Sequence, residues 1–137
     1  MNIIKVRPGK HPEVVKVDKM SLEWLQKQVG GYIQAVYPFD DPVAIVCDEE
    51  GKLKGKDLNR SLKDEDGEIY DILSGDFLIV GLGDEDFCGL DDDMVCKYLY
   101  EFYPIVTYFR DPEGIHEIDL SSDEEKRNRE LILGGQV

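Results

Sequence analysis

The sequence is poor in the residue types that most often build catalytic and metal centres. It has two histidines, His11 and His116, and three cysteines, and no two cysteines are spaced as C-x-x-C. Neither histidine lies in an H-E-x-x-H motif, and no serine lies in a G-x-S-x-G motif. These absences argue against zinc centres and against the common hydrolase centres. The sequence therefore predicts no metal site, no cofactor and no enzyme activity.

Long apolar runs are also missing. No segment approaches the roughly 18 apolar residues that a membrane-spanning helix needs. The start, MNIIKVRPGKHPE, lacks the apolar stretch of a secretory signal peptide. Cys47, Cys88 and Cys96 are odd in number, which favours free thiols in a reducing compartment. We expect a cytoplasmic protein that makes no membrane contact.

Basic residues are scarce in the second half of the chain. Residues 1–63 carry 11 Lys and Arg against 9 Asp and Glu, whereas residues 64–137 carry 5 against 21, and the formal net charge is -14. An excess this uneven predicts one strongly negative side on the folded domain. Direct binding to nucleic acid is disfavoured, because contacts to phosphates need cationic groups. A basic protein partner is favoured instead.

What is present is the pattern of an α+β domain. With 137 residues, of which 42% are hydrophobic, the chain can bury one substantial core. Two helices are predicted: one from Ser21 as N-cap to Gly30-Gly31, and one over 91–103, where the apolar spacing is helical. We expect an antiparallel or mixed sheet of about five to seven strands, with the two main helices packed on one face. The predicted strands are 2–6, 13–17, 32–37, 42–47, 68–72, 76–82, 105–109 and 115–120.

The C-terminal end differs from the rest. Ser122 and Glu125 have the spacing of a capping box, but the following helix is almost wholly charged until its last turn. Such a helix has little apolar surface to bury, so we expect it to be marginal or partner-dependent. We therefore expect one acidic domain over 1–120 and a charged helix or tail over 121–137.

Three motifs carry a resemblance to a known family. They are VGGYIQAVYPFDDPVAIVCDEEGKLKGKDLNRSL from Val29, then DEDGEIYDILSGDFLIVG from Asp64, then an acidic segment and a helix that ends near Tyr103. In order and spacing the chain resembles domain of unknown function 3846. That resemblance implies a protein of plasmids, phages and conjugative elements, mainly of Gram-positive bacteria, with no established activity or catalytic residue. The C-terminal third departs from the family pattern.

The acidic residues of the second half include one dense cluster. Its carboxylates could form a solvated loop and helix cap, a calcium or magnesium site, or a negative surface that docks into a basic groove. The spacing is not that of an EF-hand loop, which disfavours the metal site. The cluster consists of Asp84, Glu85, Asp86, Asp91, Asp92 and Asp93.

A second candidate site lies in the polar segment 52–62, which we expect to be a loop with a short strand or helical turn. There Asn59 and Arg60 could bind a phosphate or carboxylate. Arg60 could equally pair with Asp64 or Asp71 and fix the loop. Asp71, inside the apolar segment IYDIL, either faces outward or is paired.

Two functions follow from these candidates. The first is a non-enzymatic accessory protein of a mobile element that binds a basic host protein through the acidic cluster. Its extreme form is a DNA mimic with an anti-defence role, directed at the nucleic-acid cleft of a restriction or CRISPR nuclease. The alternative is a small-molecule or nucleotide-binding module, or an unrecognised enzyme, that uses the Asn59-Arg60 loop. The oligomeric state stays open.

Overall fold

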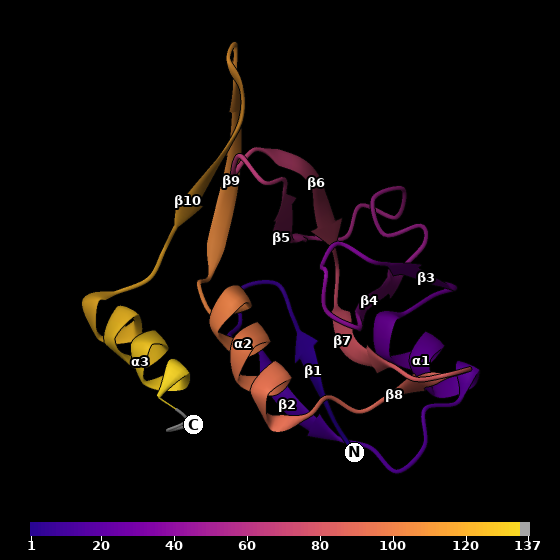
Figure 1. Ribbon diagram of the computed structural model, residues 1–137. Coiled ribbons are helices and arrows are strands. Elements are labelled where there is room, and N and C mark those ends of the chain that lie inside the picture. Colours follow the sequence, from indigo (N-terminus) through magenta and orange to yellow (C-terminus); the bar gives the residue numbers. More distant parts are fainter. Residues whose placement is uncertain (135–137) are drawn as a thin grey trace.

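The computed structural model describes residues 1–134, and its centre is one antiparallel sheet (Figure 1). The strand order in this sheet is β2-β1-β7-β4-β3, and β8 pairs with the end of β7. The α+β class predicted from the sequence is confirmed. The elements of this sheet are β1 (Asn2–Val6), β2 (Glu13–Lys16), β3 (Ile33–Val36), β4 (Val43–Asp48), β7 (Phe77–Leu82) and β8 (Phe87–Cys88).

Two helices enclose the sheet: α1 (Leu22–Val29) and α2 (Asp92–Phe102). Alternate side chains of each strand point to opposite faces. Ala44, Val46 and Leu78 pack in one buried cluster with the inner residues of α1. Their sequence neighbours Ile45 and Ile79 point to the other face and pack in a second buried cluster with the inner residues of α2. The expectation that both helices lie on one face is therefore not confirmed, because α1 and α2 cover opposite faces.

The ends of α1 follow the local signals in the sequence. The Ser21 hydroxyl accepts a hydrogen bond from the Trp24 N–H at 3.1 Å, as an N-cap does. Gly30 closes the helix in the left-handed conformation, with φ at 77°. A Cβ on Gly31 would lie 2.5 Å from Lys54 Nζ and 2.6 Å from a carboxylate oxygen of Asp48, so a side chain there would displace this ion pair. The glycine pair both ends the helix and lets β4 approach it.

A two-stranded sheet lies beside this core and consists of β5 (Leu58–Lys63) and β6 (Ile69–Ser74) (Figure 1). The predicted loop over 52–62 is thus only partly correct. Its second half is a strand with two register irregularities against β6, in which Asn59, Arg60 and Leu62 are buried. The polar side chains concealed this strand, because burial of Asn59 and Arg60 breaks the usual alternation of apolar and polar residues.

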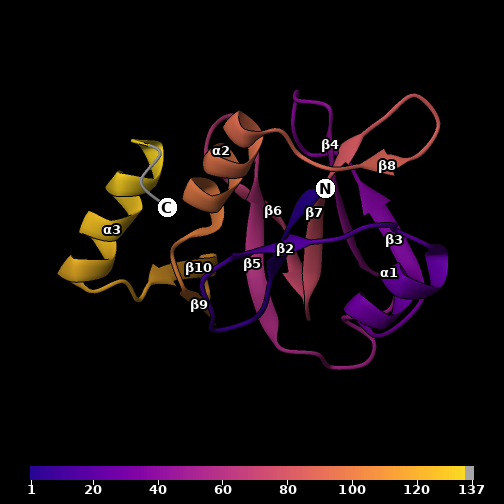
Figure 2. The ribbon, with the colours of Figure 1, turned by 90° about the horizontal axis from the view of Figure 1, so that it is seen from below.

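The C-terminal part adds a hairpin, β9 (Val106–Asp111) and β10 (Gly114–Asp119), and the helix α3 (Asp123–Leu133). The hairpin projects from the body as a narrow ribbon, and α3 lies beside α2 (Figures 1 and 2). The Ser122 and Glu125 capping box is confirmed. We call residues 104–134 the C-terminal extension. The last three residues of the predicted tail 121–137 lie outside the described residues.

None of the helices within residues 1–134 is both long enough and apolar enough to cross a membrane.

Candidate functional site

Strand register brings the two halves of the predicted acidic cluster to the same end of the sheet. β7 ends at Leu82, and the loop that follows it carries the first three acidic residues. The chain then returns past the start of β1, where the Leu90 N–H donates to the Asn2 carbonyl oxygen at 2.7 Å, and enters α2. We call this set the acidic pole: Asp84, Glu85, Asp86, Asp91, Asp92 and Asp93.

All six side chains of the acidic pole belong to exposed residues. Asp91 is the N-cap of α2, and its Oδ1 accepts from the Met94 N–H at 2.8 Å. Across the described chain, none of the six takes part in an ion pair. The only basic residue of α2, Lys97, pairs with Asp41 instead. The pole therefore presents uncompensated negative charge to solvent.

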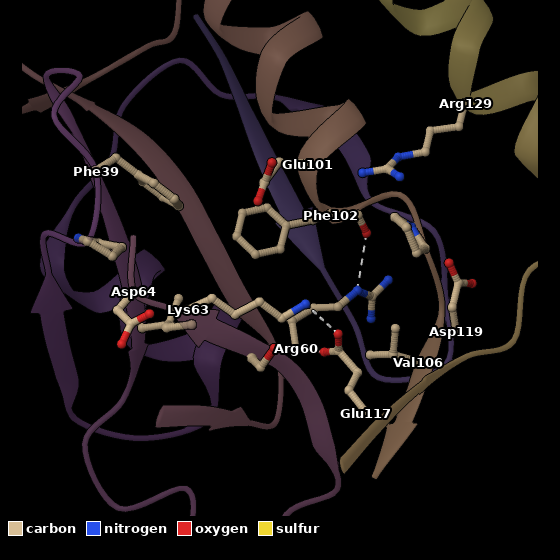
Figure 3. Close-up of a pocket in the computed structure, with 14 residues that line it drawn as sticks. Phe39, Arg60, Lys63, Asp64, Glu101, Phe102, Val106, Glu117, Asp119 and Arg129 are labelled. Atoms are coloured by element: carbon tan, nitrogen blue, oxygen red, sulfur yellow. Dashed lines mark hydrogen bonds and ion pairs between the residues drawn. The ribbon is translucent and has the colours of Figure 1, made fainter. Parts of the chain in front are cut away.

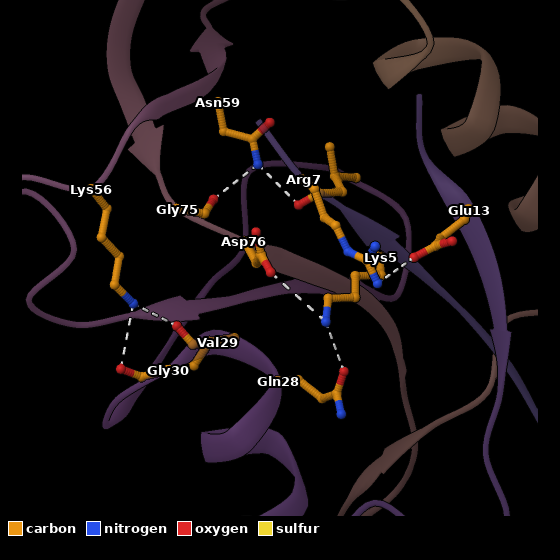
Figure 4. Close-up of polar contacts among 11 residues, drawn as sticks. Lys5, Arg7, Glu13, Gln28, Val29, Gly30, Lys56, Asn59, Gly75 and Asp76 are labelled. Atoms are coloured by element: carbon orange, nitrogen blue, oxygen red, sulfur yellow. Dashed lines mark hydrogen bonds and ion pairs between the residues drawn. The ribbon is translucent and has the colours of Figure 1, made fainter. Parts of the chain in front are cut away.

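Lys54 and Lys56 lie near the start of β7, at the opposite end of the sheet from the acidic pole. Figure 4 shows Lys56 reaching the carbonyl oxygens of Val29 and Gly30. Lys54 and Lys56 contact the carboxylate of Asp48 at 2.8 and 2.7 Å. Lys56 also donates to the carbonyl oxygen of Val29 at the end of α1, at 2.7 Å. A groove of about 720 Å³ runs along this end. Its basic lining residues are Arg7, Lys10, Lys27, Lys54 and Lys56.

Asp48 is the anionic centre of this basic end. Burial by itself would raise the pKa of Asp48, but hydrogen bonds from Lys54, Lys56 and the Glu50 N–H outweigh burial and lower the pKa to about 2. Asp48 therefore stays ionised and holds both lysines. These lysines are committed at the basic end and do not neutralise the acidic pole.

Asn59 and Arg60 are structural residues of a buried strand. The Asn59 Nδ2 donates to the carbonyl oxygens of Val6 and Gly75, each at 2.9 Å, and Asn59 is 1% exposed. Figure 4 shows both hydrogen bonds of the Asn59 amide, one to Gly75 and one to the carbonyl oxygen next to Arg7. Arg60 is 3% exposed. Asn59 can therefore offer little to a ligand, and Arg60 can do so only where it lines a cavity.

The hydrogen bonds of Arg60 also correct a prediction. Its Nε donates to Phe102 O at 3.1 Å and its Nη2 to Lys10 O at 2.7 Å, while Nη1 donates to Asn59 Oδ1 at 2.8 Å. No carboxylate of the described chain pairs with it, so the expected partners Asp64 and Asp71 are wrong. Burial lowers the pKa of the Arg60 guanidinium from its usual value.

Asp71 is not brought into the same site. It pairs with Lys52, and its Oδ1 also accepts from the Ile72 N–H at 2.9 Å. Asp71 and Lys52 line a separate cavity beside Cys47, whereas Arg60 lines another. The three residues of the second candidate site thus do not act together.

The cavity at Arg60 has a volume of about 420 Å³ and lies where the C-terminal extension meets the core (Figure 3). Phe39, Arg60 and Phe102 form its inner wall, and residues of the extension form its outer wall. The outer-wall residues are Pro104, Val106, Glu117, Asp119 and Arg129.

Glu117 is the anchor of this outer wall. Its carboxylate accepts from Ser61 Oγ at 2.7 Å, Lys63 Nζ at 2.6 Å and Tyr108 OH at 2.8 Å. Burial would raise the pKa of Glu117, but these three donors hold it below its usual value. Burial also raises the pKa of Tyr108, so its hydroxyl stays protonated as a donor. Sequence analysis missed Glu117 and Arg129, since no local pattern marks either residue.

The tip of the β9–β10 hairpin holds a group that sequence analysis also passed over. Asp111, Glu113 and His116 offer ligand-type atoms that lie within 4.8 Å of one another. His116 Nε2 lies 2.8 Å from Asp111 Oδ1, and its ring stacks on Phe109 with centroids 4.9 Å apart. A hydrogen bond between Asp111 and His116 accounts for this arrangement.

Comparison with known families decides the membership of the chain. The profile of one family, described as domain of unknown function (DUF3846), matches residues 1–103. The chain belongs to this family. The match ends one residue before the extension begins, so the family region supplies the whole sheet, α1, α2 and the acidic pole. Searches of curated proteins and of solved structures gave no match.

Proposed function

We propose that this protein is a non-enzymatic binding protein whose acidic pole docks onto a basic surface of another protein. The observation that carries the proposal is the pole itself: six exposed carboxylates at one end of the sheet, none of them in an ion pair with a residue of 1–134. Carboxylates that only kept the protein soluble could be spread evenly over the surface. Their concentration at one end gives the molecule a direction for electrostatic attraction.

The separation of the two charged ends supports the same proposal. Two lysines of the first half, Lys54 and Lys56, lie at the far end of the strands, where Asp48 and the carbonyl groups at the end of α1 hold them. They cannot fold back onto the pole without giving up these contacts. A basic partner would therefore meet a surface that the protein does not neutralise itself.

More specifically, we propose that the partner surface is the nucleic-acid cleft of a host nuclease. The protein would then act as a DNA mimic carried by a mobile element. Duplex DNA presents about one negative charge per 1.7 Å of its axis. The first turn of α2 places consecutive carboxylates, Asp92 and Asp93, at a helical rise of about 1.5 Å per residue. This spacing supports the mimic only over a short stretch, because Lys97 follows on the same helix.

A pair of charge-matched variants tests the proposal. In the first, all six residues of the pole become amides, and Asp91→Asn preserves the N-cap because asparagine caps as well as aspartate. In the second, six exposed acids elsewhere become amides, so that the net charge changes equally. These six are Asp57, Glu65, Asp66, Glu68, Glu113 and Glu124.

Affinity capture from the host, followed by direct binding of each purified partner, is the measurement. We expect the pole variant to lose the partner and the control to keep it, with an affinity that falls steeply as salt rises toward about 0.5 M. Equal loss in both variants would show that net charge alone matters and that the pole is not a docking site. Salt-insensitive binding would remove the electrostatic basis of the proposal.

Small-molecule binding is the second candidate function. One observation favours it: the cavity of about 420 Å³ beside Arg60, which is within the size range of ligand sites, roughly 300–1,000 Å³. The site differs from the one expected from sequence, since Asn59 is fully engaged and the outer wall comes from the extension.

A further inference from the structure

The cavity beside Arg60 contains an unusual distribution of charge. Arg60 is a buried cation whose four acceptors are all uncharged oxygens: Phe102 O, Lys10 O, Asn59 O and Asn59 Oδ1. Its Nη2 uses one N–H for Lys10, and the other has no acceptor within residues 1–134. Figure 3 shows the guanidinium of Arg60 between Phe102 and Glu117. A buried cation is thus left with spare hydrogen-bonding capacity at the cavity.

Arg129 supplies a second guanidinium from the outer wall. Its Nε donates to the Tyr100 carbonyl oxygen at 2.8 Å, and the guanidinium carbon lies 4.0 Å from the centre of the Tyr100 ring. These contacts fix the plane of the group. Its two terminal nitrogens have no hydrogen-bond partner among the described residues, and Figure 3 shows the group reaching from α3 toward the cavity. A fixed guanidinium with free terminal nitrogens suits a carboxylate, which it can bind through two hydrogen bonds.

The same cavity also holds carboxylates that are not ion-paired. Glu101 accepts no hydrogen bond within the described chain, and Asp119 accepts one at 2.8 Å, from the Ser121 N–H. Lys63 and Glu117 neutralise each other across the cavity. The lining groups without an ion-pair partner among the described residues are therefore two arginines and three carboxylates, Asp64, Glu101 and Asp119. Figure 3 shows Glu101 and Asp119 on opposite sides of the two guanidinium groups.

Unpaired groups of both charge signs determine which class of ligand the cavity can bind. A simple anion would gain the arginines but would face Glu101 and Asp119, while a simple cation would meet the reverse conflict. A molecule with both charges avoids each conflict, because like charges in a confined site repel. Phe39, Phe102 and Val106 leave an apolar wall for a side chain.

We propose that the cavity binds a small zwitterion of the amino-acid class. Its carboxylate accepts hydrogen bonds from Arg129 and Arg60, and its ammonium group donates to Glu101. This site lies apart from the acidic pole and does not depend on the function proposed for it. Since Arg129 belongs to the extension, the site requires a residue beyond the family match.

Thermal-shift and calorimetric binding of the full chain to a panel of free L-amino acids tests the proposal. We expect one or more of them to raise the melting temperature at about 10 mM. The N-acetylated and the amidated forms of each binder, which lack one of the two charges, should bind at least about tenfold more weakly. No stabilisation by any amino acid, or equal binding of acetate or inorganic phosphate, would overturn the proposal.

Two variants locate the site. Glu101→Gln removes a charge from an exposed residue that accepts no hydrogen bond within residues 1–134, so the fold should be unaffected. Arg129→Gln removes the outer guanidinium, and Arg127→Gln, on an exposed residue of the same helix that does not line the cavity, is its matched control. Binding should weaken at least about tenfold in Glu101→Gln and in Arg129→Gln but not in Arg127→Gln. Wild-type affinity in Glu101→Gln would refute the ammonium contact, and equal loss in both arginine variants would refute the site.

Discussion

The family region and the C-terminal extension are held together by different forces. Residues 1–103 bury two apolar clusters, one on each face of the sheet, and the central strands β4 and β7 are buried along almost their whole length. Within residues 104–134 only Ile132 is buried. The rest of the extension docks through polar contacts. From this difference we expect the family region to be stable by itself and the extension to depend on it for order.

One set of polar contacts between core and extension lies at the C-terminal end of α2, apart from those of Glu117 with β5. Helices leave their last carbonyl groups without partners inside the helix, and this end of the helix dipole favours cations. α2 has no basic residue in its last turn. Arg60 and Arg129 supply the missing donors from β5 and α3, to Phe102 O and Tyr100 O. The C-terminal end of α2 is therefore a point at which the extension is attached to the core.

The largest effect is expected inside the family region. Phe77 is fully buried and packs edge-on against Phe102, with ring centroids 5.5 Å apart. Phe77→Ala leaves a large void and should lower the free energy of unfolding by about 3–5 kcal/mol, measured by urea denaturation. Phe109→Ala is the control, because Phe109 is 47% exposed on the hairpin and should change stability by only about 0.5 kcal/mol. Similar losses in both variants would contradict the comparison.

The next effect should stay within the extension. Ile132 is 2% exposed and joins the cluster that contains Leu99 and Phe102 of α2. Ile132→Ala should weaken the docking of α3 by about 2–3 kcal/mol. Hydrogen exchange should show loss of protection over Asp123–Leu133, while amides of β4 and β7 keep theirs.

Leu133→Ala is the matched control for Ile132→Ala. Leu133 is 58% exposed at the end of the same helix, so its truncation should leave exchange nearly unchanged. If Ile132→Ala reduced protection in β4 and β7 as much as in α3, the core and the extension would be one cooperative unit.

The sequence predicted those features that local residues determine. Ser21 and Gly30 mark the two ends of α1, and the capping box of Ser122 and Glu125 marks the start of α3. These ends were predictable because a helix cap depends on neighbours within a few residues. The predicted strands 105–109 and 115–120 correspond to β9 and β10, whose pairing is equally local. The cavity could not be predicted, since Arg60, Glu117 and Arg129 come from three elements that lie close only after folding.

One missed feature did have a signal. The strands VAIVCD and FLIVGL are continuous apolar runs, and such runs are typical of strands covered on both faces. That pattern favours helices on opposite faces of the sheet, as the structure has them. The expectation of two helices on one face overlooked it.

A polar contact inside the family region sharpens the comparison. Asp48 has a side chain 1% exposed, between Lys54 and Lys56, whose side chains are 39% and 25% exposed. Loss of one partner from a fully buried ion pair costs about 3–5 kcal/mol, and we expect about 2 kcal/mol for Asp48→Asn because both lysines can turn to water. Chemical denaturation at neutral pH measures this.

The same residue predicts a pH dependence. The pKa of Asp48 in the folded protein is about 2, below its value in the unfolded chain. Its contribution to stability is therefore complete above about pH 4 and is lost as the pH falls toward 2. In that window the difference between wild type and Asp48→Asn should shrink. A constant difference would show that the ion pairs contribute nothing to stability.

The smallest effect is expected where Glu117 joins the two regions. Glu117→Gln keeps an oxygen that can accept from Ser61 and Tyr108 but removes the charge that binds Lys63. Lys63 is 45% exposed, so this loss should be about 0.5–1 kcal/mol. Glu117→Ala also leaves the two hydroxyl groups without their acceptor and should cost about 1 kcal/mol more. Hydrogen exchange over β9 and β10 should show a small loss of protection in Glu117→Gln and a larger loss in Glu117→Ala. Glu113→Gln, at the exposed tip of the hairpin, should leave protection unchanged. If the glutamine variant lost as much protection as the alanine variant, charge rather than hydrogen bonding would be what fastens the extension to the core.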